Sequence, residues 1–125
     1  MTQTFTVFIV DDDDFSLKLL ELAFAQTCKI EFFSTAEACL ARLNEDGCVP
    51  PDLFLLDVDL LGMDGYTLCR QIQQRPGLEN ALAIFISGYD NIGSRLEGYD
   101  AGGIDYVVKP YNMAELKKKV GSAIL

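Results

Sequence analysis

Aspartates gather directly after two short apolar runs, and this arrangement constrains the chain more than any other feature. Asp11 to Asp14 follow the run Phe5 to Val10. Asp57 and Asp59 follow the run Leu53 to Leu56. Carboxylates at the ends of buried strands repel one another, and burial raises their pKa values unless a cation neutralises them. Because oxygen ligands of this kind suit a hard cation such as Mg²⁺, the sequence predicts an acidic metal site.

Two later apolar runs end in polar groups of a different kind. Ala83 to Ile86 is followed by the hydroxyl of Ser87. Tyr106 to Val108 is followed by the ammonium of Lys109, with Pro110 behind it. Carboxylates, a hydroxyl and an ammonium together describe a site that handles phosphoryl groups.

Composition limits the domain count and the classes of partner. A chain of 125 residues, of which 50% are hydrophobic, is long enough for one domain with its own core, and we expect a single domain over residues 1–125. Nineteen acidic residues against ten basic ones give a net charge of −9, which argues against direct binding to nucleic acid or to anionic membranes. The basic run Lys117 to Lys119 is interpreted as a solvated helix face.

The cysteines and the N-terminus bear on zinc binding and on location. The four cysteines, at positions 28, 39, 48 and 69, have no C-x-x-C spacing, and the chain has no histidine, so we expect reduced, partly buried thiols and no zinc site. The N-terminus does not resemble a signal peptide, and no apolar segment approaches the about 18 residues of a membrane span. A cytoplasmic location is expected.

Apolar runs alternate with stretches of helical spacing, which is typical of an α/β protein with a parallel sheet covered on both faces. We expect strands over residues 5–10, 30–33, 53–57, 83–87 and 106–108, each followed by a helix. The last three helices are expected over residues 66–74, 92–101 and 113–124. Right-handed crossovers place the carboxyl ends of all strands at one edge, where open α/β sheets bind their ligands.

Two capping expectations concern the first two helices. Asp13 or Asp14 is expected to cap the first helix, which ends before residue 28. Its apolar residues fall on one stripe of the kind that packs against a core: Phe15, Leu19, Leu22 and Ala23. Ser34 with Glu37 has the spacing of a capping box that opens the second helix, through about residue 43.

Four segments together resemble the receiver domain of two-component response regulators, of the CheY-like type. They are FIVDDDD, PDLFLLDVDLLGMDGY, AIFISGYD and AGGIDYVVKPY, and the resemblance extends over nearly the whole chain. It implies a flavodoxin-like, doubly wound (βα)5 fold with five parallel strands in the order 2-1-3-4-5.

The resemblance also implies roles for the acidic residues. Asp57 would be the phosphoacceptor, whose carboxylate oxygen attacks phosphorus to give an acyl phosphate. Asp11 and Asp12, with Asp57 and the backbone carbonyl expected from Asp59, would bind Mg²⁺.

The other site residues follow in the same way. Lys109 would pair with Asp57 before the reaction and with a phosphoryl oxygen after it, and the Lys109-Pro110 peptide would be cis. Ser87 would donate its hydroxyl to the phosphoryl group. Tyr106 would swing inward once Ser87 is drawn towards the phosphate.

The implied function is a signalling switch that is not an enzyme beyond catalysing its own phosphorylation and dephosphorylation. The donor would be a sensor histidine kinase or a histidine phosphotransfer protein. The output would be altered affinity of the surface formed by the fourth helix, fifth strand and fifth helix for an effector domain or protein, with a phosphorylation-dependent dimer as one form of response.

The chain departs from the family pattern at several positions. Leu61 replaces a usual proline, Gly88 replaces a common alanine, and Gly103 beside Gly102 is expected to loosen the approach to the fifth strand.

Asp59, two residues past the phosphoacceptor, is expected to change the lifetime of the phosphorylated state. It could slow the reaction by repelling an incoming anionic donor or water, or speed dephosphorylation by positioning a hydrolytic water. Tyr89, two residues past Ser87, could shield the site.

Three alternatives use the same residues or the same topology. In a haloacid-dehalogenase-type phosphatase, Asp57 and Asp59 would be nucleophile and acid-base, with Ser87 and Lys109 as later motifs, but the acidic pair precedes the nucleophile here. A receiver-like adaptor that works without phosphorylation would not need the full set of site residues. A flavodoxin-type cofactor protein would need backbone amides where this chain places four carboxylates.

Overall fold

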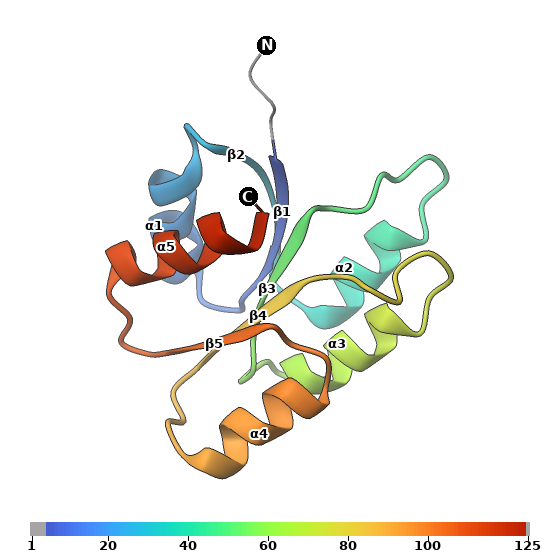
Figure 1. The fold of residues 1–125 in the computed structure, drawn as a ribbon. Coiled ribbons are helices and arrows are strands. Elements are labelled where there is room, and N and C mark those ends of the chain that lie inside the picture. The colour runs from blue at the N-terminus through green and yellow to red at the C-terminus, as the bar shows by residue number, and fades with distance from the viewer. Residues whose placement is uncertain (1–4, 125) are drawn as a thin grey trace.

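The computed structural model describes residues 5–124, in which five strands and five helices alternate along the chain (Figure 1). The strands are β1 (Phe5–Val10), β2 (Cys28–Phe33), β3 (Leu53–Asp57), β4 (Ala83–Ser87) and β5 (Asp105–Val108). The helices are α1 (Asp14–Phe24), α2 (Ala36–Leu43), α3 (Gly65–Gln73), α4 (Ile92–Asp100) and α5 (Met113–Ile124).

All strand pairs are parallel and the strand order is β2-β1-β3-β4-β5, so the predicted fold class and topology are confirmed. Helices α1 and α5 cover one face of the sheet, and α2, α3 and α4 cover the other (Figure 1). Every residue of the two central strands, β3 and β4, is buried. This burial on both faces explains why these strands read as continuous apolar runs rather than as an alternating pattern.

The apolar stripe predicted for the core-facing side of α1 is wrong for three of its four residues, since only Ala23 packs against the core. Phe15 is 70% exposed, Leu19 40% and Leu22 79%, whereas Leu20 and Phe24 are the buried residues of this helix. The sequence of α1 has apolar residues at helical spacing on more than one side, so spacing alone cannot select the packed one. An apolar stripe therefore lies on the surface of α1.

Some predicted element ends also differ from the structure. Thr35, rather than Ser34, caps α2, because its hydroxyl accepts a hydrogen bond from the amide of Ala38 at 3.0 Å. Strand β2 begins at Cys28 instead of residue 30, and α4 ends at Asp100. The cap of α1 is Asp13, which accepts from the amide of Phe15.

Gly103 is required by close packing, which corrects its interpretation as a loosening residue. A Cβ atom at Gly103 would lie 2.3 Å from the ring of Phe85 in β4. The segment before β5 therefore approaches the sheet more closely than any other residue type would permit.

A single side-chain amide ties together the connections at the amino edge of the sheet. The Nε2 atom of Gln73, at the end of α3, donates to the carbonyl oxygen of Ala81 and to that of Gly102, each at 3.0 Å. Ala81 precedes β4 and Gly102 precedes β5. The two loops that lead into these strands are thus held to one helix end.

The cysteines and helix lengths answer two further questions raised by the sequence. All four cysteines are free thiols, of which Cys28, Cys39 and Cys69 are buried and Cys48 is partly exposed. Within residues 5–124, no helix has the length and apolar character needed to cross a membrane.

Gly65, the first residue of α3, generates a prediction about stability. A Cβ atom there would lie 2.5 Å from the backbone oxygen of Asp57, so Gly65→Ala must displace the end of β3. We expect a loss of about 1–3 kcal/mol in the free energy of unfolding, the usual cost of overpacking, measured as a lower urea midpoint. The matched control is Gly121→Ala in α5, where no atom lies within 4 Å and helix propensity favours alanine. Equal midpoints for the two variants would contradict the close approach.

Candidate functional site

The carboxyl edge of the sheet brings together polar residues from four strands. Asp11 and Asp12 follow β1, Asp57 ends β3, Ser87 ends β4 and Lys109 follows β5. Asp11, Asp57 and Ser87 are buried, at 2%, 3% and 0% exposure, while Asp12 is exposed. The structure thus gathers the sequence-predicted residues at one place, which parallel strands make possible because their ends meet at the same edge.

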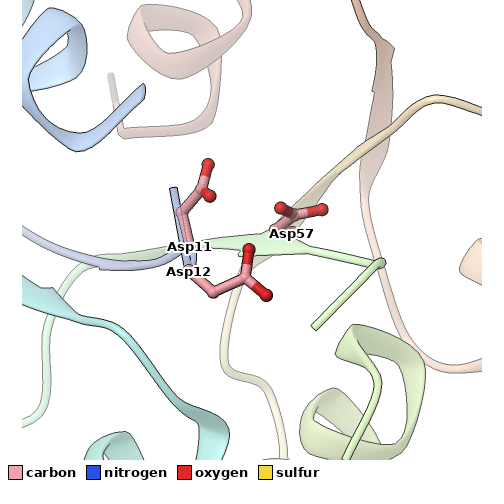
Figure 2. A group of neighbouring side chains, drawn as sticks. All are labelled: Asp11, Asp12 and Asp57. Atoms are coloured by element: carbon pink, nitrogen blue, oxygen red, sulfur yellow. The ribbon is translucent and has the colours of Figure 1, made fainter. Parts of the chain in front are cut away.

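Three carboxylates form the acidic part of this site. Each of Asp11, Asp12 and Asp57 offers an oxygen, and these oxygens lie within 4.8 Å of one another (Figure 2). Burial raises the pKa of Asp11 to about 6, against a lowering by the hydrogen bond from the Asp13 amide, and the charge of Asp57 raises it further. These carboxylates are hard oxygen donors, and their negative charges repel one another. Such a cluster suits a divalent cation such as Mg²⁺.

Lys109 contributes the positive charge next to these carboxylates. Its Nζ atom lies 3.0 Å from Oδ2 of Asp57 and 3.8 Å from Oδ2 of Asp11. Burial lowers the pKa of the Lys109 ammonium, but the hydrogen bond to Asp57 and the charges of Asp57 and Asp11 raise that pKa above its usual value overall. The Lys109-Pro110 peptide is cis. The ammonium therefore stays charged and directed at Asp57.

Both carboxylate oxygens of Asp57 are engaged. Oδ2 accepts from Lys109, and Oδ1 accepts from the backbone amide of Asp59 at 3.0 Å. Because the two contacts come from separate segments, the plane of the carboxylate is fixed relative to the sheet edge. Such fixed orientation is what a nucleophilic carboxylate requires.

On the opposite side of the site, Ser87 and Tyr106 are linked through the backbone of Tyr89. The hydroxyl oxygen of Ser87 accepts from the amide of Tyr89 at 3.1 Å, and the phenol of Tyr106 donates to the carbonyl of Tyr89 at 3.0 Å. Tyr106 is 1% exposed, with the guanidinium of Arg95 lying 5.3 Å from its ring centroid. Tyr106 thus lies inside the protein, connected to Ser87 by one residue of the β4–α4 loop.

The two residues singled out as modulating lie at the rim of the site. Asp59 is exposed, and its Oδ2 lies 3.5 Å from the amide of Gly88, a long contact that crosses from the β3–α3 loop to the β4–α4 loop. The side chain of Tyr89 is 57% exposed. Both residues contact the site through their backbone amides, which donate to Asp57 and to Ser87 respectively.

Sequence reasoning missed Tyr66 of α3. Its phenol donates to the carbonyl of Ser94 at 2.9 Å and lies 3.2 Å from the phenol oxygen of Tyr106. The sequence indicates Tyr66 only as the start of a helix. Because Tyr66 does not follow a strand, the pattern of strand ends could not reveal it.

Comparison with known proteins decides the family. Residues 7–121 match the family described as "Response regulator receiver domain". The chain belongs to this receiver family. Receiver domains are signalling modules of two-component systems, and the predicted family is confirmed.

Individual relatives agree with this assignment. The receiver domain is 31% identical over 117 residues to the response regulator PleD of Caulobacter vibrioides, covering 93% of this chain and 25% of PleD. It is 34% identical over 122 residues to the transcriptional regulatory protein AruR of Pseudomonas aeruginosa, covering 94% of this chain and 48% of AruR. A solved response-regulator structure from Chloroflexus aurantiacus is 30% identical, with a TM-score of 0.88 and 98% coverage of both chains.

These shares matter for what is inherited, because the receiver domain spans about a quarter of PleD and about half of AruR. What the remainder of each relative does is a property of that relative. The similarity therefore shows that the chain is a receiver domain, but it does not show which activity a complete regulator would have.

The raised pKa of Asp11 predicts how stability depends on pH without divalent metal. The pKa of Asp11 is about 6 in the folded protein, against the usual 3.8. Protonated Asp11 therefore stabilises the fold fully below pH 3.8, and this stabilisation is lost as the pH rises through about 6. Asp11→Asn should therefore increase the free energy of unfolding at pH 8 in EDTA by roughly 1–3 kcal/mol relative to the parent protein, and the gain should shrink towards pH 4. Urea unfolding at several pH values measures this difference.

The control is Asp46→Asn, at an exposed position in the α2–β3 connection. Its effect should be small and nearly independent of pH. If Asp11→Asn and Asp46→Asn gave the same dependence of stability on pH, the raised pKa of Asp11 would be refuted.

Proposed function

We propose that this receiver domain accepts a phosphoryl group on Asp57 from a sensor histidine kinase or a histidine phosphotransfer protein. The observation that supports this most is the buried Asp57 carboxylate, 3.0 Å from the ammonium of Lys109 and within the acidic group formed with Asp11 and Asp12. An isolated buried carboxylate would be costly, whereas one beside a lysine and a potential metal site is poised for phosphoryl chemistry.

The chemical step joins a carboxylate oxygen of Asp57 to phosphorus as the bond between phosphorus and the donor atom breaks. The electron pair of that bond leaves with the donor, which is a histidine nitrogen in a protein donor. Lys109 then exchanges its contact with Asp57 Oδ2 for one with a phosphoryl oxygen, which stabilises charge in the transition state and in the product. Asp57 keeps its orientation through the Asp59 amide.

Mg²⁺ would be held by the carboxylates of Asp11, Asp12 and Asp57, with the backbone carbonyl of Asp59 as a further ligand. When bound, the ion would neutralise the acidic cluster and the oxygens of the phosphoryl group. The long side chain of Lys109 and the fixed plane of Asp57 are the contributions that the chain itself makes to orientation.

Signal output would begin at Ser87. A hydroxyl has one proton to donate, and the oxygen of Ser87 already accepts from Tyr89, so its own proton remains available for a phosphoryl oxygen. A shift of Ser87 would move the Tyr89 backbone and the position of Tyr106. The α4-β5-α5 surface would then change its affinity for an effector, either a domain of the same protein or a separate partner, or for a second copy.

That surface has the character of an interaction site. It exposes several large apolar side chains, at 44–76% exposure: Ile92, Leu96, Tyr99 and Ile104. Ile92, Leu96 and Tyr99 recur at helical spacing along α4, Ile104 directly precedes β5, and exposed apolar groups of this kind favour contact with another protein. The single-domain boundaries over residues 1–125, the cytoplasmic location and the lack of direct nucleic-acid binding remain predictions from the sequence.

Phosphorylation itself can be measured by intact-mass analysis after incubation with Mg²⁺ and acetyl phosphate. We expect one labile phosphoryl group on the parent protein and none on Asp57→Asn or after metal removal. Lys109→Ala should reduce the rate by two orders of magnitude or more, in the range reported for the loss of one transition-state contact. A parent protein that neither gains mass nor turns over the donor would instead indicate an adaptor that works without phosphorylation.

Asp59 generates a second kinetic prediction, because its exposed carboxylate belongs to a residue whose amide contacts Asp57. We expect Asp59→Asn to increase the rate of phosphorylation by acetyl phosphate several-fold, since a negative charge that repels the anionic donor is removed. Asp46→Asn, an equal change of net charge far from the site, should leave the rate unchanged. A slower dephosphorylation with an unchanged phosphorylation rate would show that Asp59 positions water instead, and no change in either rate would exclude both roles.

A further inference from the structure

Two buried tyrosines link four segments of the molecule behind the site. The phenol oxygens of Tyr66, in α3, and Tyr106, in β5, lie 3.2 Å apart, and these residues are 6% and 1% exposed. Tyr66 also contacts the carbonyl of Ser94 in the first turn of α4, at 2.9 Å. Tyr106 also contacts the carbonyl of Tyr89 in the β4–α4 loop, at 3.0 Å.

These contacts need more protons than the two phenols carry. A neutral phenol has one proton, and burial, followed by the hydrogen bond to Tyr106, raises the pKa of Tyr66 so that it stays neutral near pH 7. Two protons must therefore serve three contacts. If Tyr66 donates to Tyr106, then Tyr106 donates to the carbonyl of Tyr89 and the carbonyl of Ser94 receives no proton. If Tyr106 donates to Tyr66, then Tyr66 donates to the carbonyl of Ser94 and the carbonyl of Tyr89 receives none.

The carbonyls of Tyr89 and Ser94, which compete for these protons, belong to the segments on which switching depends. The amide of Tyr89 is bonded to the hydroxyl oxygen of Ser87, and its carbonyl is bonded to Tyr106, so this residue is held from both sides. Ser94 belongs to α4, the helix that forms part of the output surface. The phenol pair thus connects the loop at the phosphoryl site with the helix at the output.

Packing restricts where the two rings can go. The ring of Tyr66 contacts that of Phe85 with centroids 5.0 Å apart. A Cβ atom at Gly98 of α4 would lie 3.2 Å from the ring of Tyr106, so this helix closes tightly over the tyrosine. The buried position of each ring is therefore held both by packing and by the contacts of its hydroxyl group.

We propose that Tyr66 is a positioning residue that holds Tyr106 in its buried place and couples it to α4. This inference rests on the proposed function, in which phosphorylation of Asp57 acts through Ser87 and Tyr106. Since Tyr66 stabilises the buried position of Tyr106, and that position is the one linked to phosphoryl binding, the coupling must work in both directions. Loss of the Tyr66 hydroxyl should therefore weaken binding at Asp57, although Tyr66 does not touch the site.

The test is Tyr66→Phe, which keeps the ring against Phe85 and removes the hydroxyl. The probe is beryllofluoride with Mg²⁺, an analogue of the phosphoryl group, and its dissociation constant should rise roughly two- to tenfold, the effect of one net hydrogen bond. In protein labelled with ¹³C in its tyrosine rings, the Tyr106 resonance should move towards that of an exposed ring. Thr27→Val is the matched control and should change neither reading, because it removes a hydroxyl that donates to the carbonyl of Phe24 in the α1–β2 connection.

A double variant separates coupling from simple packing. Tyr66→Phe combined with Tyr106→Phe should weaken beryllofluoride binding by less than the product of the single effects, because both remove the same contact. If the Tyr66 hydroxyl had only a structural role, its removal would lower the free energy of unfolding and leave the dissociation constant equal to that of Thr27→Val. This result would overturn the proposal.

Failure of the proposed function has a different signature. In that case the parent protein would bind beryllofluoride no better than Asp57→Asn. The Tyr106 resonance without beryllofluoride would still test whether Tyr66 keeps Tyr106 buried. An unchanged resonance in Tyr66→Phe would refute that claim.

Discussion

The constraint on which the structure depends is that carboxylates are held together at one edge of a buried sheet although their charges repel one another. Asp11 and Asp57 are almost inaccessible to water, and their charges are opposed within the chain by the ammonium of Lys109. Burial raises the pKa of Asp11, which is the sign of an arrangement that is unfavourable by itself. Hydrophobic packing of β1 and β3 supplies the free energy that keeps these groups together. The site is thus maintained by the core and is prepared for an added cation.

The sequence allowed the sheet and the site to be predicted because both follow from strand ends. Continuous apolar runs located β3 and β4 at their observed bounds, and parallel order then required Asp57 and Ser87 to lie at one edge. The nature of the side chains indicated the chemistry. The family resemblance supplied the roles that repulsion and burial alone could not assign.

Other features could not be predicted, for specific physical reasons. Helix α1 has apolar residues on more than one side, so spacing did not reveal that Phe15 and Leu22 face outward. Ser34 and Thr35 are adjacent hydroxyl residues, and only backbone geometry determines which one caps α2. The contact between Tyr66 and Tyr106 joins residues 40 positions apart from a helix and a strand, which no local pattern encodes.

The Gln73 amide at the amino edge of the sheet has a consequence for how the fold can respond to charge. It joins the loops before β4 and β5 to α3 through neutral hydrogen bonds, whereas the carboxyl edge adds ionised groups to its backbone hydrogen bonds. A new charge at the carboxyl edge redistributes the ionic contacts there, but it does not change the protonation or the bonding capacity of an amide. The amino ends of β4 and β5 therefore have a fastening that is insensitive to charge, so an electrostatic change at the carboxyl edge acts on only one end of these two strands.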